Sequence, residues 1–354
     1  MYRTLIVLFI LCGLMTWKVQ AAQVVEGPAG GKPMFAKTGP KGETHLIFDK
    51  DGEVFYASST DSGGTWSTPL PVINTASKTP GLEFDAWDLA VGSDGKVHVA
   101  LGNNAWKLKL PKDQWGFFYA SLAPGEKVFS PLRNLNHLPS EGFSLAAGPN
   151  GRIGAFYLAG KVFGMLSSDN GGTFSAPGEV NPALNPCECC ETRVAAGPNG
   201  SMAIFYRDKT GGNRDLYFAN LSSGGQSTRE KVSVTGWPIN ACPMTYYSIV
   251  PSKSGYVVAW PTKETVFFGR LDPQGKLLPP GEVKTPGTHG MRTGLLALEA
   301  PNGHVLVGWN NNSMLGWQEY DEKSLGLGLP GSAKTTGTGM AAFVDARGNF
   351  VIVK

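Results

Sequence analysis

The feature that most constrains the fold is a strand–turn–strand unit that returns about every fifty residues along the chain. In each copy an apolar run leads into a tight turn built on Gly, Asn or Asp, and a second apolar run follows. Such turn residues accept the positive φ angles of hairpins, so each copy predicts two antiparallel strands. Strong copies begin at Val91, Ala147, Ala196, Val250 and Glu299, and weaker copies begin at Lys37 and Val344.

Most units continue with a third apolar strand and a short fourth one. The third strands are predicted at Glu53–Ser58, Gly116–Ala120, Val162–Leu166, Leu216–Ala219, Thr265–Arg270 and Met314–Glu319. Several short strands in each long repeat are typical of a β-propeller, and no helical periodicity of useful length competes with this interpretation.

The two ends of the chain are expected to close the ring. Six complete units are followed by a last hairpin, Gly339–Val344 and Asn349–Val353, and the N-terminal segment Gln23–Glu26 is predicted to add the outer strand. Mixing the termini in one blade protects sheet edges. We therefore predict an all-β fold, a single propeller of four-stranded antiparallel blades over residues 22–354, with seven blades favoured over six.

Two short stretches are near-copies of each other: SSTDSGGTW from Ser58 and LSSDNGGTF from Leu166. Each reads Ser-x-Asp-x-Gly-Gly-Thr-aromatic. The Asp side chain can accept backbone hydrogen bonds of its own turn, and the Gly pair permits positive φ. The structural residues of these turns are predicted to be Asp61, Trp66, Asp169 and Phe174.

This motif resembles the Asp-box of the sialidase-like (BNR-repeat) β-propellers. In that family the motif joins the two outer strands of a blade, on the face away from the ligand. The resemblance implies catalysis by a Tyr nucleophile activated by a Glu, with an Asp acid/base and three arginines on a substrate carboxylate. Tyr246 or Tyr247 with Glu191 are the candidates here for the Tyr/Glu pair.

The family's first arginine stands in an Arg-Ile-Pro segment near the start of the chain, where this sequence has Gly31-Lys32-Pro33-Met34-Phe35. We therefore expect no ordinary sialidase activity and predict a binding protein for a carbohydrate or a metal. An exo-acting glycoside hydrolase of sialidase type is the alternative.

Ligands are expected where the loops that enter the inner strands meet, over the central channel. Candidate ligand-binding residues on these loops are Arg193, Arg214, Arg292, His289, Trp87 and Asp88. Arg207 is a further candidate. The competing interpretation pairs Arg207 with Asp208 and Arg214 with Asp215 in structural salt bridges, because arginine serves both purposes.

Four cysteines lie in two of these loops. NPCECCETR carries Cys187, Cys189 and Cys190, and WPINACPM carries Cys242. The two loops precede neighbouring inner strands, so the sulfurs are predicted to meet at one rim. At least one disulfide involving Cys242 is the first expectation for an exported chain. The alternative is a thiolate site for copper or zinc, with Met244, His289, Met291 or Met340 nearby.

The N-terminus predicts export. Arg3 precedes an apolar run from Leu5 to Met15, and Val19-Gln20-Ala21 resembles a cleavage site, so residues 1–21 are predicted to be a signal peptide. The fifth cysteine, Cys12, belongs to this segment. The apolar run is shorter than the roughly 20 residues that a membrane span needs, so a secreted or periplasmic location without a membrane span is expected. The formal net charge of +3 includes no basic run, which argues against a nucleic-acid partner.

Overall fold

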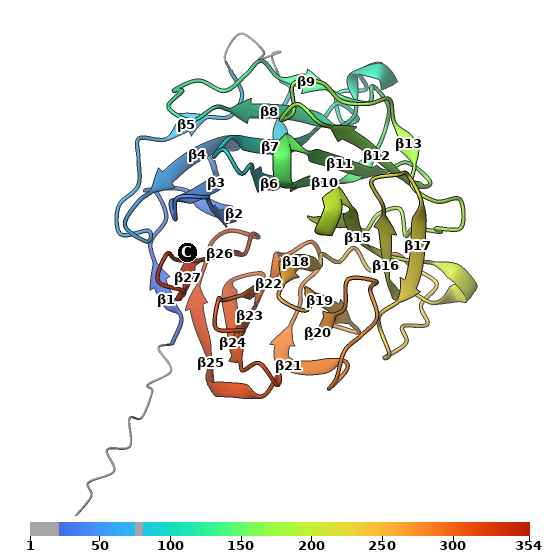
Figure 1. Ribbon diagram of the computed structural model, residues 1–354. Helices are drawn as coiled ribbons and strands as arrows, with labels where there is room; N and C mark the ends of the chain where they lie inside the picture. The colour runs from blue at the N-terminus through green and yellow to red at the C-terminus, as the bar shows by residue number, and fades with distance from the viewer. Residues whose placement is uncertain (1–20, 75–80) are drawn as a thin grey trace, which may run out of the picture.

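The computed structural model describes residues 21–74 and 81–354. The predicted signal peptide, except its last residue, lies outside the described residues. Seven sheets surround a central channel (Figure 1). The seven-bladed propeller predicted from the repeats is thus confirmed.

Six blades have four strands each, in meander order from the inside outward. Blade one is β2 (Lys32–Thr38), β3 (Thr44–Lys50), β4 (Glu53–Ser59) and β5 (Leu70–Pro71). Blade two is β6 (Phe84–Val91), β7 (Val97–Asn103), β8 (Phe118–Leu122) and β9 (Arg133–Asn134). Blade three is β10 (Glu141–Ala147), β11 (Ile153–Leu158), β12 (Val162–Ser167) and β13 (Gly178–Glu179).

Blade four is β14 (Thr192–Ala196), β15 (Met202–Arg207), β16 (Leu216–Leu221) and β17 (Ser227–Lys231). Blade five is β18 (Ser248–Ser252), β19 (Gly255–Thr262), β20 (Thr265–Leu271) and β21 (Val283–Thr288). Blade six is β22 (Leu295–Glu299), β23 (Val305–Asn311), β24 (Met314–Tyr320) and β25 (Gly326–Lys334).

The closing blade joins both ends of the chain. It consists of β26 (Ala341–Val344), β27 (Phe350–Val353) and the N-terminal strand β1 (Gln23–Val25). The N-terminal segment supplies the outer strand, as predicted, but this blade has three strands in the described chain, and β1 runs parallel to β27. The parallel pairing follows from the topology, because a strand added from the other terminus need not reverse direction as a hairpin does.

The repeated turns explain why the hairpins recur. In two of the three Pro-Asn-Gly copies, Asn150 and Asn199 have φ angles of 57° and 54°, and the following glycines both have φ of 71°. These turns are the short 3-10 segments η3 (Pro149–Gly151) and η4 (Pro198–Gly200). The only other helical segments in the described residues are η2 (Lys112–Gln114) and η5 (Thr210–Gly212). None of the described helices is long and apolar enough to cross a membrane.

The two Ser-x-Asp-x-Gly-Gly-Thr turns have the same hydrogen bonds. Asp61 accepts from Thr65 N at 2.8 Å and from the Ser59 hydroxyl at 2.7 Å, and Asp169 accepts from Thr173 N and Ser167 at the same distances. Both turns connect the third strand of a blade to its fourth, opposite the loops that enter the inner strands. They complete a blade and take no part in the channel.

Hydrophobic layers between the blades form the core. Between blades four and five, Phe205 and Phe218 pack with Trp260, which is fully buried. Cys187 and Cys190 belong to this same layer. The cysteine loop is therefore held by the core below it.

Candidate functional site

A cavity of about 420 Å³ lies over the channel. Its lining comes from all seven inner strands and the loops before them, and its polar and aromatic members include Lys37, Asp85, Trp87, Asp88, Glu141, Cys189, Glu191, Arg193, Tyr246, Arg292 and Thr338. Such a concave site with a few converging polar groups suits a small-molecule or saccharide ligand.

Arg193 is the most strongly bound cation of the cavity. Its guanidinium forms a two-pronged contact with Glu191, at 2.6 Å through Nη2 and 3.0 Å through Nε. It also donates to the carbonyl oxygen of Trp87 at 2.9 Å and lies 3.5 Å from Asp88. Asp88 in turn accepts from the Ser144 hydroxyl at 2.8 Å and so ties blade two to blade three. Arg193 therefore links three blades and has few donors left for a ligand.

Glu191 is buried, with 2% of its surface exposed. Burial raises its pKa to about 7, against the opposing effect of the Arg193 charge. The backbone N–H of Tyr247 donates to the same carboxylate at 3.0 Å. The partners of the Glu191 carboxylate are thus Arg193 and a backbone donor, and no tyrosine hydroxyl of the described residues bonds to it.

The two candidate tyrosines have different environments. Tyr247 is 1% exposed, and its hydroxyl donates to the carbonyl of Glu191 and accepts from Arg207 N at 3.1 Å. Tyr246 is half-buried and lines the cavity, and burial together with the Glu191 charge raises its pKa to about 12. Of the two, Tyr246 is the one that can meet a ligand.

Arg292 and Trp87, two of the predicted ligand-binding residues, also line the cavity. Arg292 is exposed, and its guanidinium has no hydrogen bond or ion pair within the described ranges. Trp87 packs edge-on against Phe143, with ring centres 5.2 Å apart, and presents part of its ring to the channel.

His289 does not reach the cavity. It is buried, its Nε2 lies 2.7 Å from the carbonyl oxygen of Thr293, and burial lowers its pKa to about 4. It fixes the loop between blades five and six. Lys37 lines the cavity although sequence reasoning missed it. The available signal was a lone lysine in the inner strand β2, where alternate side chains face the channel.

Three of the four cysteines predicted to meet at the rim between blades four and five do so. The sulfurs of Cys187 and Cys190 lie 3.4 Å and 3.8 Å from that of Cys242, and all three lie within 4.8 Å of one another. A disulfide requires about 2.05 Å, and all four cysteines outside the predicted signal peptide are free. The expected disulfide is therefore absent from this structure, and the three sulfurs form a cluster that could bind a metal. Cys189 lies outside this group of three and lines the channel cavity, and burial together with the neighbouring Cys242 raises its pKa to about 11.

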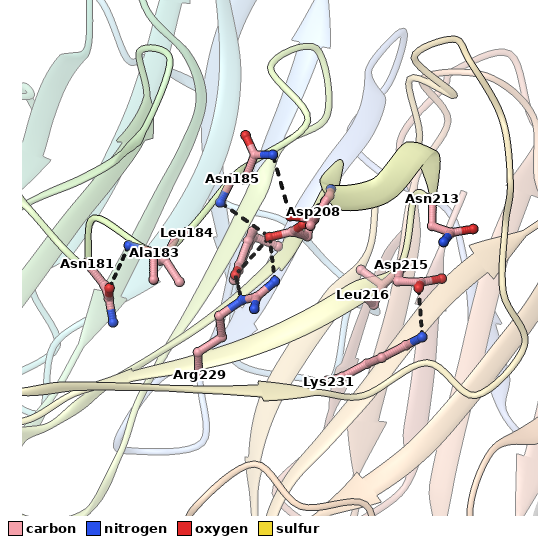
Figure 2. A network of polar contacts seen from close by, with 12 residues as sticks. Asn181, Ala183, Leu184, Asn185, Asp208, Asn213, Asp215, Leu216, Arg229 and Lys231 are labelled. Carbon is pink, nitrogen blue, oxygen red and sulfur yellow. Dashed lines mark hydrogen bonds and ion pairs between the residues drawn. The ribbon is translucent and has the colours of Figure 1, made fainter.

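The predicted Arg207–Asp208 and Arg214–Asp215 salt bridges are wrong. Figure 2 shows Asp208 paired with Arg229 and Asp215 paired with Lys231, at 2.9 Å and 2.7 Å. Successive residues of an extended chain point to opposite sides, so each Asp turns away from its neighbouring Arg. Asp208 also accepts the backbone N–H of Asn185 at 3.3 Å and thereby anchors the start of the cysteine loop (Figure 2).

Arg207 and Arg214 consequently lie beside the sulfurs. Burial lowers the pKa of Arg207 and the nearby Cys190 opposes that effect, while the charge of Arg214 helps to lower the pKa of Cys187. Interactions with the side chains of Cys190 and Cys242 lower the pKa of Cys187. Arg214 does not line the channel cavity, contrary to the prediction that it serves ligand binding there.

No protein-family model and no curated protein matches the chain. Solved structures do resemble it. The α-L-arabinanase of Penicillium chrysogenum has a TM-score of 0.54 at 15% identity, covering 86% of this chain and 98% of that chain. The NanB sialidase of Streptococcus pneumoniae has a TM-score of 0.54 at 10% identity, covering 88% of this chain and 70% of that chain. The SapL1 lectin has a TM-score of 0.51 at 12% identity, covering 88% of this chain and 97% of that chain. At these identities the likeness shows the β-propeller fold.

Proposed function

We propose that this chain is an exported, sialidase-like binding propeller whose channel cavity takes an anionic carbohydrate. The observation that carries the proposal is the pair of unengaged cations in the cavity, Arg292 and Lys37, next to the aromatic rings of Trp87 and Tyr246. Aromatic faces pack on sugar rings, and guanidinium and ammonium groups bind carboxylates. Propellers of this fold include a lectin in complex with a fucoside and an arabinanase with arabinobiose, which supports a carbohydrate ligand.

An ordinary sialidase reaction is disfavoured by the same geometry. The guanidinium of Arg193 already donates hydrogen bonds to Glu191 and to the carbonyl of Trp87. The hydroxyl of Tyr247 donates to the buried carbonyl of Glu191. Only Tyr246 and Glu191 remain for the alternative, an exo-acting glycoside hydrolase. Turnover of a fluorogenic sialoside that Tyr246→Phe abolishes would favour that alternative over binding alone.

The binding proposal is tested by calorimetric titration with a uronic-acid oligosaccharide and its neutral counterpart. Binding of the acidic ligand only is expected, with Arg292→Ala weakening it at least tenfold. Arg347 is the matched control, because its side chain is 68% exposed and lies on the β26–β27 turn, away from the channel. Equal loss in Arg347→Ala, or preference for the neutral ligand, would contradict the proposal.

A second candidate function rests on the sulfur cluster. We propose that it holds copper or zinc, since thiolates are ligands for both. Export is part of the proposal as well, and N-terminal sequencing of the protein from its native host should begin at Ala22.

A further inference from the structure

The sulfur geometry of the cluster matches a metal site more closely than a disulfide. A metal with bonds of about 2.3 Å holds three sulfurs about 4.0 Å apart in a plane and about 3.8 Å apart in a tetrahedron. The observed separations are 3.4 Å and 3.8 Å, with the third below 4.8 Å. Small side-chain adjustments therefore suffice to bind an ion at the centre.

The fold holds the three ligands in place. Cys187 N–H donates to the carbonyl of Arg207 at 2.7 Å, and Cys190 N–H donates to the carbonyl of Cys187 at 3.1 Å. This turn brings two sulfurs together. The loop carrying Cys242 is tied to blade four, because Arg214 N–H donates to the carbonyl of Trp237 at 2.9 Å.

A buried positive charge lies beside the cluster, and the carboxylate that acts on it, Asp215, is too distant to form an ion pair. Arg207 is 1% exposed and forms no ion pair with any carboxylate in the described parts of the chain. Its Nη2 donates to the Pro261 carbonyl at 2.7 Å and to Thr245 at 3.1 Å, while its Nε has no partner. The Nε of Arg214 is also buried and unpartnered. Uncompensated buried charge is costly, so an anion is expected at this position.

We propose that Cys187, Cys190 and Cys242 bind one Cu(I) ion as a three-coordinate thiolate complex whose negative charge is balanced by Arg207 and Arg214. This inference rests on the metal function proposed above and specifies which metal ion the cluster binds. Three Cu–S bonds form, and each sulfur that carries a proton loses it to solvent as its S–H bond breaks. The complex of Cu⁺ with three thiolates carries two negative charges, which the two guanidinium groups match.

The ligand number selects Cu(I) over zinc. Structural zinc is almost always four-coordinate, and the cluster of the described residues supplies three ligand atoms in a largely buried setting. The remaining cysteine of the loop, Cys189, is more exposed and faces the channel cavity. Thiolates are soft ligands that suit Cu(I).

The test is an anaerobic titration of the reduced full-length protein with Cu(I) against bathocuproine disulfonate, and with Zn(II) against a chromophoric chelator. One Cu(I) per chain is expected. Serine at any of the three ligand positions should lower the affinity for Cu(I) by more than the roughly 10–100-fold that follows loss of an outer-sphere partner. The matched control Cys189→Ser should stay within about threefold of the wild type.

The outcomes separate the two proposals. One zinc that needs Cys189 as well as the other three would keep the metal function and overturn the Cu(I) assignment. No binding of either ion by protein with four titratable thiols would overturn both.

The role of the arginines is tested by Arg207→Met and, should that variant not fold, by the half-buried Arg214→Gln. Each variant should lower the affinity for Cu(I) by roughly 10–100-fold. The stoichiometry of one ion per chain and the thiolate-to-copper absorption band should be preserved. Unchanged affinity in both variants would contradict the charge-balance argument.

Discussion

Two buried arginines on neighbouring parts of the same rim have opposite surroundings. Arg193 has a carboxylate at 2.6 Å, a second at 3.5 Å and a carbonyl acceptor. Arg207 is more deeply buried and has carbonyl and hydroxyl acceptors, three thiols nearby and no carboxylate ion pair in the described chain. The first is a completed structural junction between blades. The second has no carboxylate in an ion pair with it, which is why we propose a binding site at the sulfur cluster and not at Arg193.

Substitutions that inactivate the sulfur cluster and the channel cavity separately test whether they are independent sites. Cys242→Ser should reduce Cu(I) affinity by more than about 100-fold and leave acidic-saccharide binding unchanged. Arg292→Ala should do the reverse. Titrating both variants with both ligands checks this, and loss of both activities in either variant would mean that cavity and cluster are one site.

The ion pair of Arg193 should be essential for stability. Glu191→Ala leaves a buried guanidinium with one distant carboxylate and should lower the free energy of unfolding by about 3–5 kcal/mol. The control Glu188→Ala removes an exposed pair with Lys209 and should cost at most about 1 kcal/mol. Urea denaturation of the two variants measures the difference, and equal effects would show that the Glu191 pair is no structural junction.

Glu191 should also give a characteristic pH dependence. Its pKa in the folded state is raised to about 7 from an ordinary value of 4.5, so the folded protein holds this proton more tightly than the unfolded chain. The resulting stability is fully present below pH 4.5 and is lost as the pH rises through 7. The unfolding free energy of the wild type minus that of Glu191→Gln should therefore fall across this range, by on the order of 1–3 kcal/mol. A flat or rising difference would contradict this.

Asp61 should make the smallest contribution to stability, and the pH dependence of this contribution should have the opposite sign to that of Glu191. Backbone and hydroxyl donors of Thr65 and Ser59 lower its pKa to about 2 from 3.8. Its contribution is present above pH 3.8 and is lost as the pH falls through 2. Asp61→Asn should lower the thermal midpoint slightly at neutral pH and less at acid pH, without changing Cu(I) stoichiometry. A change in stoichiometry would show that this face communicates with the rim.

The sequence was sufficient for features that depend on local pattern. Repeated turn residues specify hairpins, hairpins at a fixed period specify blades, and loop position places Cys187, Cys190 and Cys242 at one rim. Side-chain partners depend on which way each residue points. Asp208 follows Arg207 in sequence yet reaches Arg229 across the blade, and His289 turns into its own loop. Lys37 was missed because one lysine in a strand gives no signal until the ring of inner strands is closed.

The most direct test of the account is X-ray absorption at the copper K-edge of protein loaded with one Cu(I). We predict three sulfurs at about 2.2–2.3 Å from copper, no nitrogen or oxygen ligand, and the same spectrum in Cys189→Ser. Two sulfurs with a nitrogen or oxygen ligand, or a copper environment that changes in Cys189→Ser, would contradict the assignment of Cys187, Cys190 and Cys242 as the complete ligand set.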